Sequence, residues 1–122
     1  MSSWYEEGKI HKTLSEYMVR SKSEVIIANL FFERGIQFKY EVPLYASNGT
    51  FYIPDFTISF QGETWYWEHL GMLNNDSYRK HWEKKENWYK ENGFYDRLIV
   101  TDEKDGFDSK KVQQIIESMF MV

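Results

Sequence analysis

Apolar positions recur at helical spacing in the first well-patterned segment of the chain. Ser21 and Glu24 match the N-cap and N3 positions of a capping box, in which each side chain bonds the other residue's backbone amide. The apolar run Val25–Phe32 continues this helix, and Gly35 supplies the left-handed residue that commonly ends one. A short helix is also expected upstream, at Glu6–Tyr17.

Alternation of apolar and polar residues then predicts three strands. Gln37–Ala46 and Phe51–Phe60 flank Asn48 and Gly49, a dipeptide that favours a tight hairpin turn. Thr64–Leu70 follows a second turn and is so aromatic that we expect both of its faces to be covered. The three strands are expected to form a hairpin-built meander.

The last third of the chain predicts a helix, a strand and a helix. Asn75–Asn92 carries an aromatic stripe at helical spacing, Arg97–Thr101 is a short apolar strand, and Asp108–Met121 is amphipathic. The whole order, α-β-β-β-α-β-α, predicts an α/β (α+β) fold with a mixed central sheet flanked by helices.

Composition narrows the class of protein. The chain has 122 residues, no cysteine, 19% aromatic residues and a formal charge of −4. That length suits one domain over residues 1–122, with an N-terminal extension at 1–20 and a C-terminal helix at 108–121. The lack of cysteine excludes a disulfide scaffold, a thiolate metal site and a cysteine nucleophile.

Targeting and charge add two expectations. We see no signal-peptide pattern and no apolar run of bilayer length, so a cytoplasmic protein without membrane association is expected. The acidic balance argues against a general nucleic-acid coat protein, because phosphate binding is driven by lysine and arginine.

Four charged residues stand where the pattern favours apolar ones. Glu24 extends the apolar stripe of the first helix, Asp55 follows a proline inside a predicted strand, Glu68 lies in the aromatic strand, and Lys85 projects from the aromatic stripe of the long helix. Each has an ordinary structural explanation: a capping residue, an exposed strand residue, half of a core ion pair and a lysine that reaches water along aromatic rings. Three carboxylates beside an inward lysine also suit Mg²⁺ or Mn²⁺ and metal-assisted phosphodiester hydrolysis.

The element order and three of these residues resemble the PD-(D/E)XK nuclease superfamily, which has the restriction-endonuclease-like fold. The resemblance covers about residues 21–101 and includes Glu24 on the first helix, Pro54-Asp55 on a strand and Glu68 on the next strand. More narrowly, the strings Ser-Lys-Ser-Glu, Pro-Asp-Phe and Trp-Glu-His-Leu-Gly are similar to small bacterial and phage members and to helicase-associated nuclease domains.

The resemblance implies a role for each site residue. Asp55 and Glu68 would ligate the metal together with the backbone carbonyl of His69. Glu24 would support the metal directly or through water, and Lys85 would act on the attacking water. His69 itself is expected on the strand face opposite Glu68, so it suits a catalytic base less well than Lys85 does.

The sequence departs from the family at one position. The usual lysine lies two residues after the second acidic residue, where this chain has Leu70. In some members the lysine has migrated to the following helix, and Lys85 matches that arrangement. Expected phosphate contacts flank the proposed site: Lys22, Tyr78, Arg79 and Lys80.

These features together predict a Mg²⁺-dependent DNA endonuclease or nuclease, with Mn²⁺ able to substitute. The expected partner is DNA, or RNA, and tight binding would come from a homodimer or a larger nuclease–helicase assembly. One alternative is a catalytically inactive nuclease-fold module that binds nucleic acid or a protein partner, which the leucine at position 70 favours. Another is an interaction domain whose exposed tryptophan and tyrosine residues form a protein interface.

Overall fold

The computed structural model describes residues 8–121, which form a mixed α+β protein. Over these residues there are three α-helices, a four-stranded sheet and two small two-stranded sheets. The chain divides into two compact units. One contains the residues up to Gln37 together with those from Asp108 onward, and the other is Phe38–Phe107. No helix among the described residues is long and apolar enough to cross a lipid bilayer.

The first unit contains the capped helix α2 (Lys22–Glu33), which forms where it was predicted. Glu24 N donates to Ser21 Oγ at 3.2 Å, and Glu24 Oε1 accepts a hydrogen bond from Ser21 N at 3.1 Å. Gly35 follows the helix with φ of +68°, the left-handed conformation that glycine adopts at little cost. The predicted capping box is confirmed.

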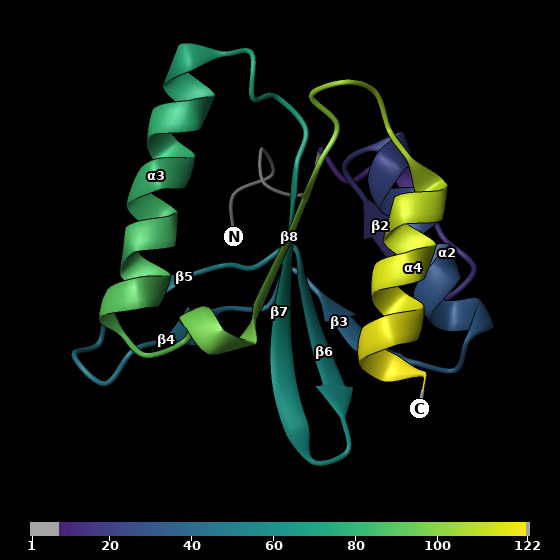
Figure 1. Cartoon of the computed structure of the whole chain (residues 1–122), viewed down its shortest axis with the longest axis horizontal. Coiled ribbons are helices and arrows are strands. Elements are labelled where there is room, and N and C mark those ends of the chain that lie inside the picture. Colours follow the sequence, from purple (N-terminus) through teal and green to yellow (C-terminus); the bar gives the residue numbers. More distant parts are fainter. Residues whose placement is uncertain (1–7, 122) are drawn as a thin grey trace. The chain divides into compact units, whose positions relative to one another are not determined.

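The helix α4 (Ser109–Phe120) lies beside α2 in the same unit (Figure 1). The unit also contains an antiparallel pair of short strands, β1 (His11–Lys12) and β2 (Met18–Val19). The expected helix at Glu6–Tyr17 is wrong over its described part, from residue 8 onward. The chain there forms β1 and then a turn in which Glu16 has φ of 70°, a conformation that a right-handed helix excludes.

The second unit is built on the four-stranded sheet, whose strand order is β3-β6-β7-β8. The strands are β3 (Gln37–Tyr40), β6 (Phe56–Phe60), β7 (Glu63–Leu70) and β8 (Leu98–Asp102). The pair β6 and β7 is antiparallel and the pair β7 and β8 is parallel, so the sheet is mixed, as predicted.

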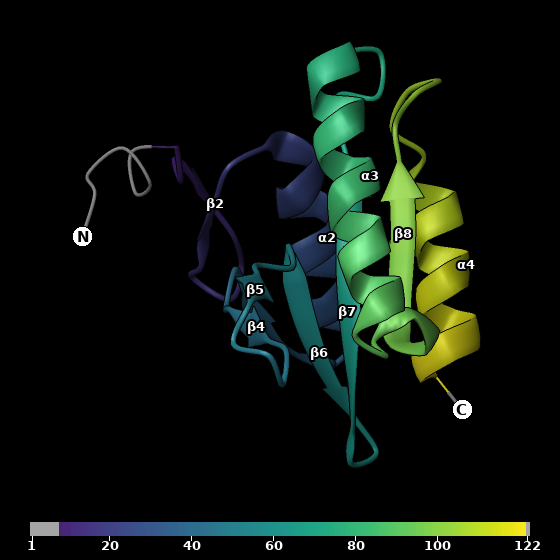
Figure 2. The ribbon, with the colours of Figure 1, turned by 90° about the vertical axis from the view of Figure 1, so that its left-hand side faces the viewer.

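The long helix α3 (Asp76–Glu91) connects β7 to β8 and packs against one face of the sheet (Figure 2). Its ends follow from the sequence, because Asn75 caps the first turn through Tyr78 N and Asn92 is the C-cap. A short 3₁₀ turn, η1 (Tyr95–Arg97), then leads into β8.

The predicted hairpin between Gln37–Ala46 and Phe51–Phe60 is divided into two separate ladders. β4 (Leu44–Tyr45) and β5 (Phe51–Tyr52) form a small antiparallel sheet of their own at the predicted turn. The outer halves of the two segments become β3 and β6 in the main sheet.

Two prolines explain this division. Pro43 precedes β4 and Pro54 lies between β5 and β6, and neither has the backbone N–H that a continuous ladder needs. Between the ladders Glu41 takes φ of 51°, and its amide donates to the carbonyl oxygen of Asp55 at 3.0 Å. The break therefore places Asp55 outside regular pairing, immediately before β6 begins.

An aromatic core holds α3 to the sheet and to the small β4–β5 sheet. Trp88 and Tyr89 from α3 pack with Tyr66 of β7 and with Ala46, and Trp88 Nε1 donates to Thr50 Oγ1 at 2.9 Å. This packing fixes the helix face that carries Lys85.

A buried polar cluster lies on the other face of β7. Trp67 Nε1 donates to Thr101 Oγ1 at 3.0 Å, and Nδ1 of His69 lies 2.8 Å from the same oxygen. Nε2 of His69 is 2.7 Å from Glu103 Oε2. His69 therefore faces away from Glu68, as predicted from the alternation along the strand.

The variant Thr101→Val tests how much this cluster stabilises the sheet. Valine keeps the shape of threonine but leaves the buried Trp67 N–H and His69 ring nitrogen without their shared partner, so we expect a loss of about 2–4 kcal/mol in the free energy of unfolding. Urea denaturation measures it. Thr64→Val, at an exposed position of the neighbouring strand β7, is the control and should change stability by less than about 0.5 kcal/mol. Equal urea midpoints for the two variants would show that this cluster does not stabilise the sheet.

Candidate active site

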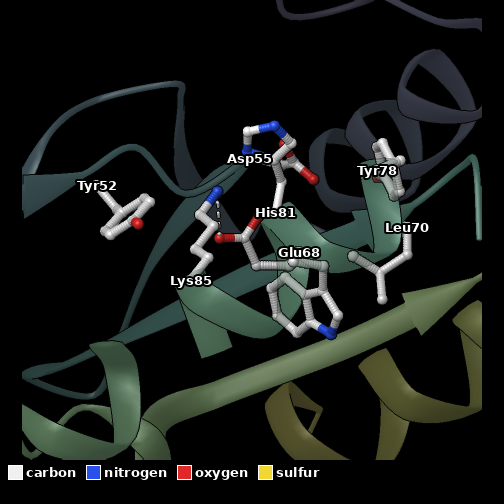
Figure 3. Close-up of a pocket in the computed structure, with 8 residues that line it drawn as sticks. Tyr52, Asp55, Glu68, Leu70, Tyr78, His81 and Lys85 are labelled. Atoms are coloured by element: carbon white, nitrogen blue, oxygen red, sulfur yellow. Dashed lines mark ion pairs between the residues drawn. The ribbon is translucent and has the colours of Figure 1, made fainter. Parts of the chain in front are cut away.

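A pocket of about 350 Å³ lies in the second unit between the end of β7 and α3 (Figure 3). Its walls come from the β5–β6 segment, from β7 and from α3, namely Tyr52, Asp55, Glu68, Leu70, Tyr78, His81, Trp82 and Lys85. The β6–β7 ladder begins with Phe56 opposite Trp67, so Asp55 comes just before the ladder, next to the part of β7 that carries Glu68. Both carboxylates line the pocket.

Glu68 is the most buried charged group at this site, with 2% of its side chain exposed. Both side-chain hydrogen bonds that it accepts go to Oε2, one from Lys85 Nζ at 2.7 Å and one from the Tyr89 hydroxyl at 2.6 Å. Burial raises the pKa of Glu68, and the charge of Lys85 with these hydrogen bonds opposes part of that rise.

Lys85 points into the pocket, which confirms the orientation predicted from the helical stripe. Besides its ion pair with Glu68, Nζ donates to the carbonyl oxygen of Ile53 at 2.8 Å, and 19% of the side chain is exposed. Lys85 therefore connects α3 both to β7 and to the segment just before Asp55.

Asp55 is held by the backbone of the neighbouring strand. Its Oδ2 accepts a hydrogen bond from His69 N at 2.7 Å. A carboxylate oxygen of Glu41 lies within 4.8 Å of one of Asp55. The alternative in which Asp55 is simply an exposed strand residue does not fit these contacts, because the side chain is half-buried and bonded to the backbone of β7.

Tyr89 is the partner of Glu68 that the sequence analysis did not identify. Burial raises its pKa, and the negative charge of Glu68 raises it further. The hydroxyl therefore stays protonated and remains a hydrogen-bond donor. The available signal was a tyrosine, and not a phenylalanine, one helical turn after Lys85 in the aromatic stripe.

Three other residues near the pocket were also missed. His81 lies one turn before Lys85 on α3, and that spacing could have indicated it. Tyr52 and Glu41 owe their positions to the break between the two ladders, which the alternating pattern concealed.

Two predicted site residues, Glu24 and Lys22, are not among the residues that line the pocket. Glu24 and Lys22 belong to the first unit, where Glu24 is buried and its Oε1 accepts hydrogen bonds from the amides of Arg20 and Ser21, each at 3.1 Å. Lys22 is exposed at the first position of α2. The capping role of Glu24 is thus realised in the structure.

The predicted phosphate contacts on α3 differ from one another. The hydroxyl of Tyr78 accepts a hydrogen bond from Gly71 N at 3.2 Å, and this residue lines the pocket. Arg79 pairs with Asp76 and donates to the carbonyl oxygen of Leu73. Lys80 lies on an exposed part of the helix, outside the main pocket.

Comparison with known proteins places a similar segment in a much longer archaeal protein. The chain is 44% identical over 92 residues to the uncharacterized protein MJ1519 of Methanocaldococcus jannaschii, a match that covers 74% of this chain. The chain spans 8% of the length of that relative. No protein-family model matches the chain, and no solved structure matches it.

The burial of Glu68 predicts a particular pH dependence of stability. Because its pKa is raised in the folded protein, the folded state keeps this proton to a higher pH than the unfolded state does. The contribution of Glu68 to stability is therefore fully present at pH values below its pKa in the unfolded chain. It is lost as the pH rises through the pKa of Glu68 in the folded protein.

Glu68→Gln should remove this dependence, because the amide carbonyl still accepts from Lys85 and Tyr89 without a charge to desolvate. We expect the variant, in EDTA, to show a flatter dependence of melting temperature on pH than wild type in the range where Glu68 loses its proton. Thermal unfolding by circular dichroism at a series of pH values measures this dependence. Glu83→Gln, an exposed change on α3, should follow wild type. Curves of melting temperature against pH that run parallel for wild type and Glu68→Gln would refute the prediction.

Proposed function

We propose that the second unit carries a divalent-metal-dependent nuclease site that hydrolyses phosphodiester bonds in DNA. One observation supports this above the others: the carboxylates of Asp55 and Glu68 line one pocket. Lys85 of α3 lines it too and pairs with the carboxylate of Glu68. The order helix, strands, helix and strand is also compatible with the PD-(D/E)XK core that the sequence resembles.

The donor set fits Mg²⁺. Both carboxylates supply oxygen, the ligand atom that this ion prefers, and a nearly buried carboxylate is costly unless a cation compensates it. Asp55 and Glu68 would hold the ion, with Glu41 as a third carboxylate close to Asp55. The His69 carbonyl would assist, since it should lie on the same side of β7 as the His69 N–H, which faces Asp55. When bound, Mg²⁺ supplies positive charge that acidifies water and neutralises charge on the phosphate.

The residues of the chain would prepare the reaction in three ways. Lys85 Nζ would orient the attacking water and stabilise the negative charge that develops on the phosphate oxygens. Tyr89 keeps Glu68 Oε2 in place, and the aromatic wall of Trp82 and Tyr52 limits access of bulk water. The new bond joins the water oxygen to phosphorus, and the bond from phosphorus to the leaving sugar oxygen breaks. The attacking water would release its proton to solvent, and the leaving oxygen would take one up from solvent. Glu24 belongs to the first unit, and no step of the reaction is assigned to it.

A second candidate is a catalytically inactive module with a nuclease-like fold that binds nucleic acid or a protein partner. Leu70 lines the pocket at the place where the family usually has its lysine, and Glu68 already has an internal counter-charge in Lys85. Such a module would keep the ion pair as structure and would not cut DNA.

A cleavage assay separates the two candidates. We expect wild-type protein to cut single-stranded, duplex or branched DNA with Mg²⁺ or Mn²⁺ but not with EDTA. Asp55→Asn should reduce the rate by at least about 100-fold, because the isosteric amide removes the anionic ligand. Asp105→Asn, in an exposed loop, is the matched control and should cut normally. Absence of metal-dependent cutting, or full activity in Asp55→Asn, would favour the inactive module.

Lys85→Met tests the proposed role of the lysine separately. The variant keeps the aliphatic stem but loses the ammonium group, so we expect kcat to fall by about 100-fold or more while Mn²⁺ still binds. Single-turnover cleavage and calorimetric titration of Mn²⁺ provide the two readouts. A folded Lys85→Met protein that cuts at the wild-type rate would remove Lys85 from the mechanism.

A further inference from the structure

We infer that one exposed face of α3 is a phosphate-binding track that holds the DNA strand next to the pocket. The track consists of Ser77, Lys80, His81 and Lys84, and the inference rests on the proposed nuclease function. It adds to that function the surface that binds the phosphates next to the cleaved bond.

The four residues form a continuous surface. Their spacing of i, i+3, i+4 and i+7 confines them to an arc of about 100° on the helix. Together they line a second hollow of about 240 Å³. His81 lines both this hollow and the main pocket, so the two hollows adjoin each other along the helix.

The two lysines of the track differ from the paired cations beside them on α3 in the part of the chain that the structure describes. Neither Lys80 nor Lys84 takes part in an ion pair there, whereas Arg79 is paired with Asp76 and Lys85 with Glu68. Two lysines one turn apart repel each other, which disfavours the helix slightly. In a chain of net charge −4 this unpaired cationic stripe is suited to an external anion.

The length of the track matches the spacing of nucleotides along a nucleic-acid strand. From Ser77 to Lys84 the helix rises about 10.5 Å, at 1.5 Å per residue. A strand of duplex DNA advances about 3.4 Å per nucleotide, so the track spans about three nucleotides. Lysine ammonium and serine hydroxyl groups bind phosphate without reading bases, so the contact should be independent of sequence.

This placement revises the expected phosphate contacts on α3. Lys80 keeps that role, Lys84 and His81 join it, and Arg79 leaves it because its guanidinium is already engaged by Asp76 and Leu73.

Salt-dependent binding tests the track without requiring cleavage. Fluorescence anisotropy of labelled duplex and single-stranded oligonucleotides is measured in EDTA for wild type, Lys80→Gln/Lys84→Gln and the control Lys39→Gln/Lys90→Gln. The control makes the same charge change at exposed positions of the same unit that line neither hollow. Circular dichroism verifies that each variant is folded.

The track predicts two changes that the control does not show. The slope of log K against log salt concentration should fall in magnitude by about 1.8 for duplex DNA, or by about 1.4 for a single strand, because two phosphate contacts are lost. Affinity at low salt should fall by about 10-fold or more.

The outcomes distinguish this inference from the proposed function. A reduced slope in the track variant, with no metal-dependent cutting by wild type, would support the track and reject the nuclease. Cutting by wild type with equal slopes in the track variant and the control would overturn the track and leave the nuclease proposal intact.

Discussion

The ion pair between Lys85 and Glu68 is the interaction on which the second unit depends. Removing two charges from water costs several kcal/mol for each group, and their attraction offsets this only when the geometry is good and further hydrogen bonds are made. Here the two atoms are 2.7 Å apart, Tyr89 donates to the same carboxylate oxygen, and Lys85 also reaches the Ile53 carbonyl. Both donors come from one face of α3, so the pair sets the position of that helix on the sheet.

The same ion pair would also serve the proposed metal-dependent chemistry. The carboxylates of Asp55 and Glu68 face one space before any ligand arrives, and Asp55 is fixed by the amide of His69. A preorganised site of this kind spends little free energy on rearrangement when charge develops during a reaction. The arrangement also accounts for the aromatic excess of the sequence, because Tyr66, Trp88 and Tyr89 form the packing that holds these groups in place.

Local signals in the sequence predicted much of this arrangement. The capping box at Ser21, the extent of α3 and the inward direction of Lys85 depend on residues close together in the chain, and all three are confirmed. The divided hairpin was not predicted, because the alternation of residues 37–46 continues unchanged across the break. Only Pro43 and Pro54 together show that the ladder cannot continue there. The bond from Tyr89 to Glu68 joins residues 21 positions apart, so the helical spacing of Tyr89 indicates its direction but not its partner.

A crystal soaked in Mn²⁺ tests the central claim most directly, through anomalous diffraction at the manganese edge. A nuclease site of the proposed kind predicts one strong peak about 2.2 Å from carboxylate oxygens of both Asp55 and Glu68, with Lys85 beside it. A pocket without a peak, with Lys85 still bound to Glu68, would contradict the account and identify the pair as purely structural.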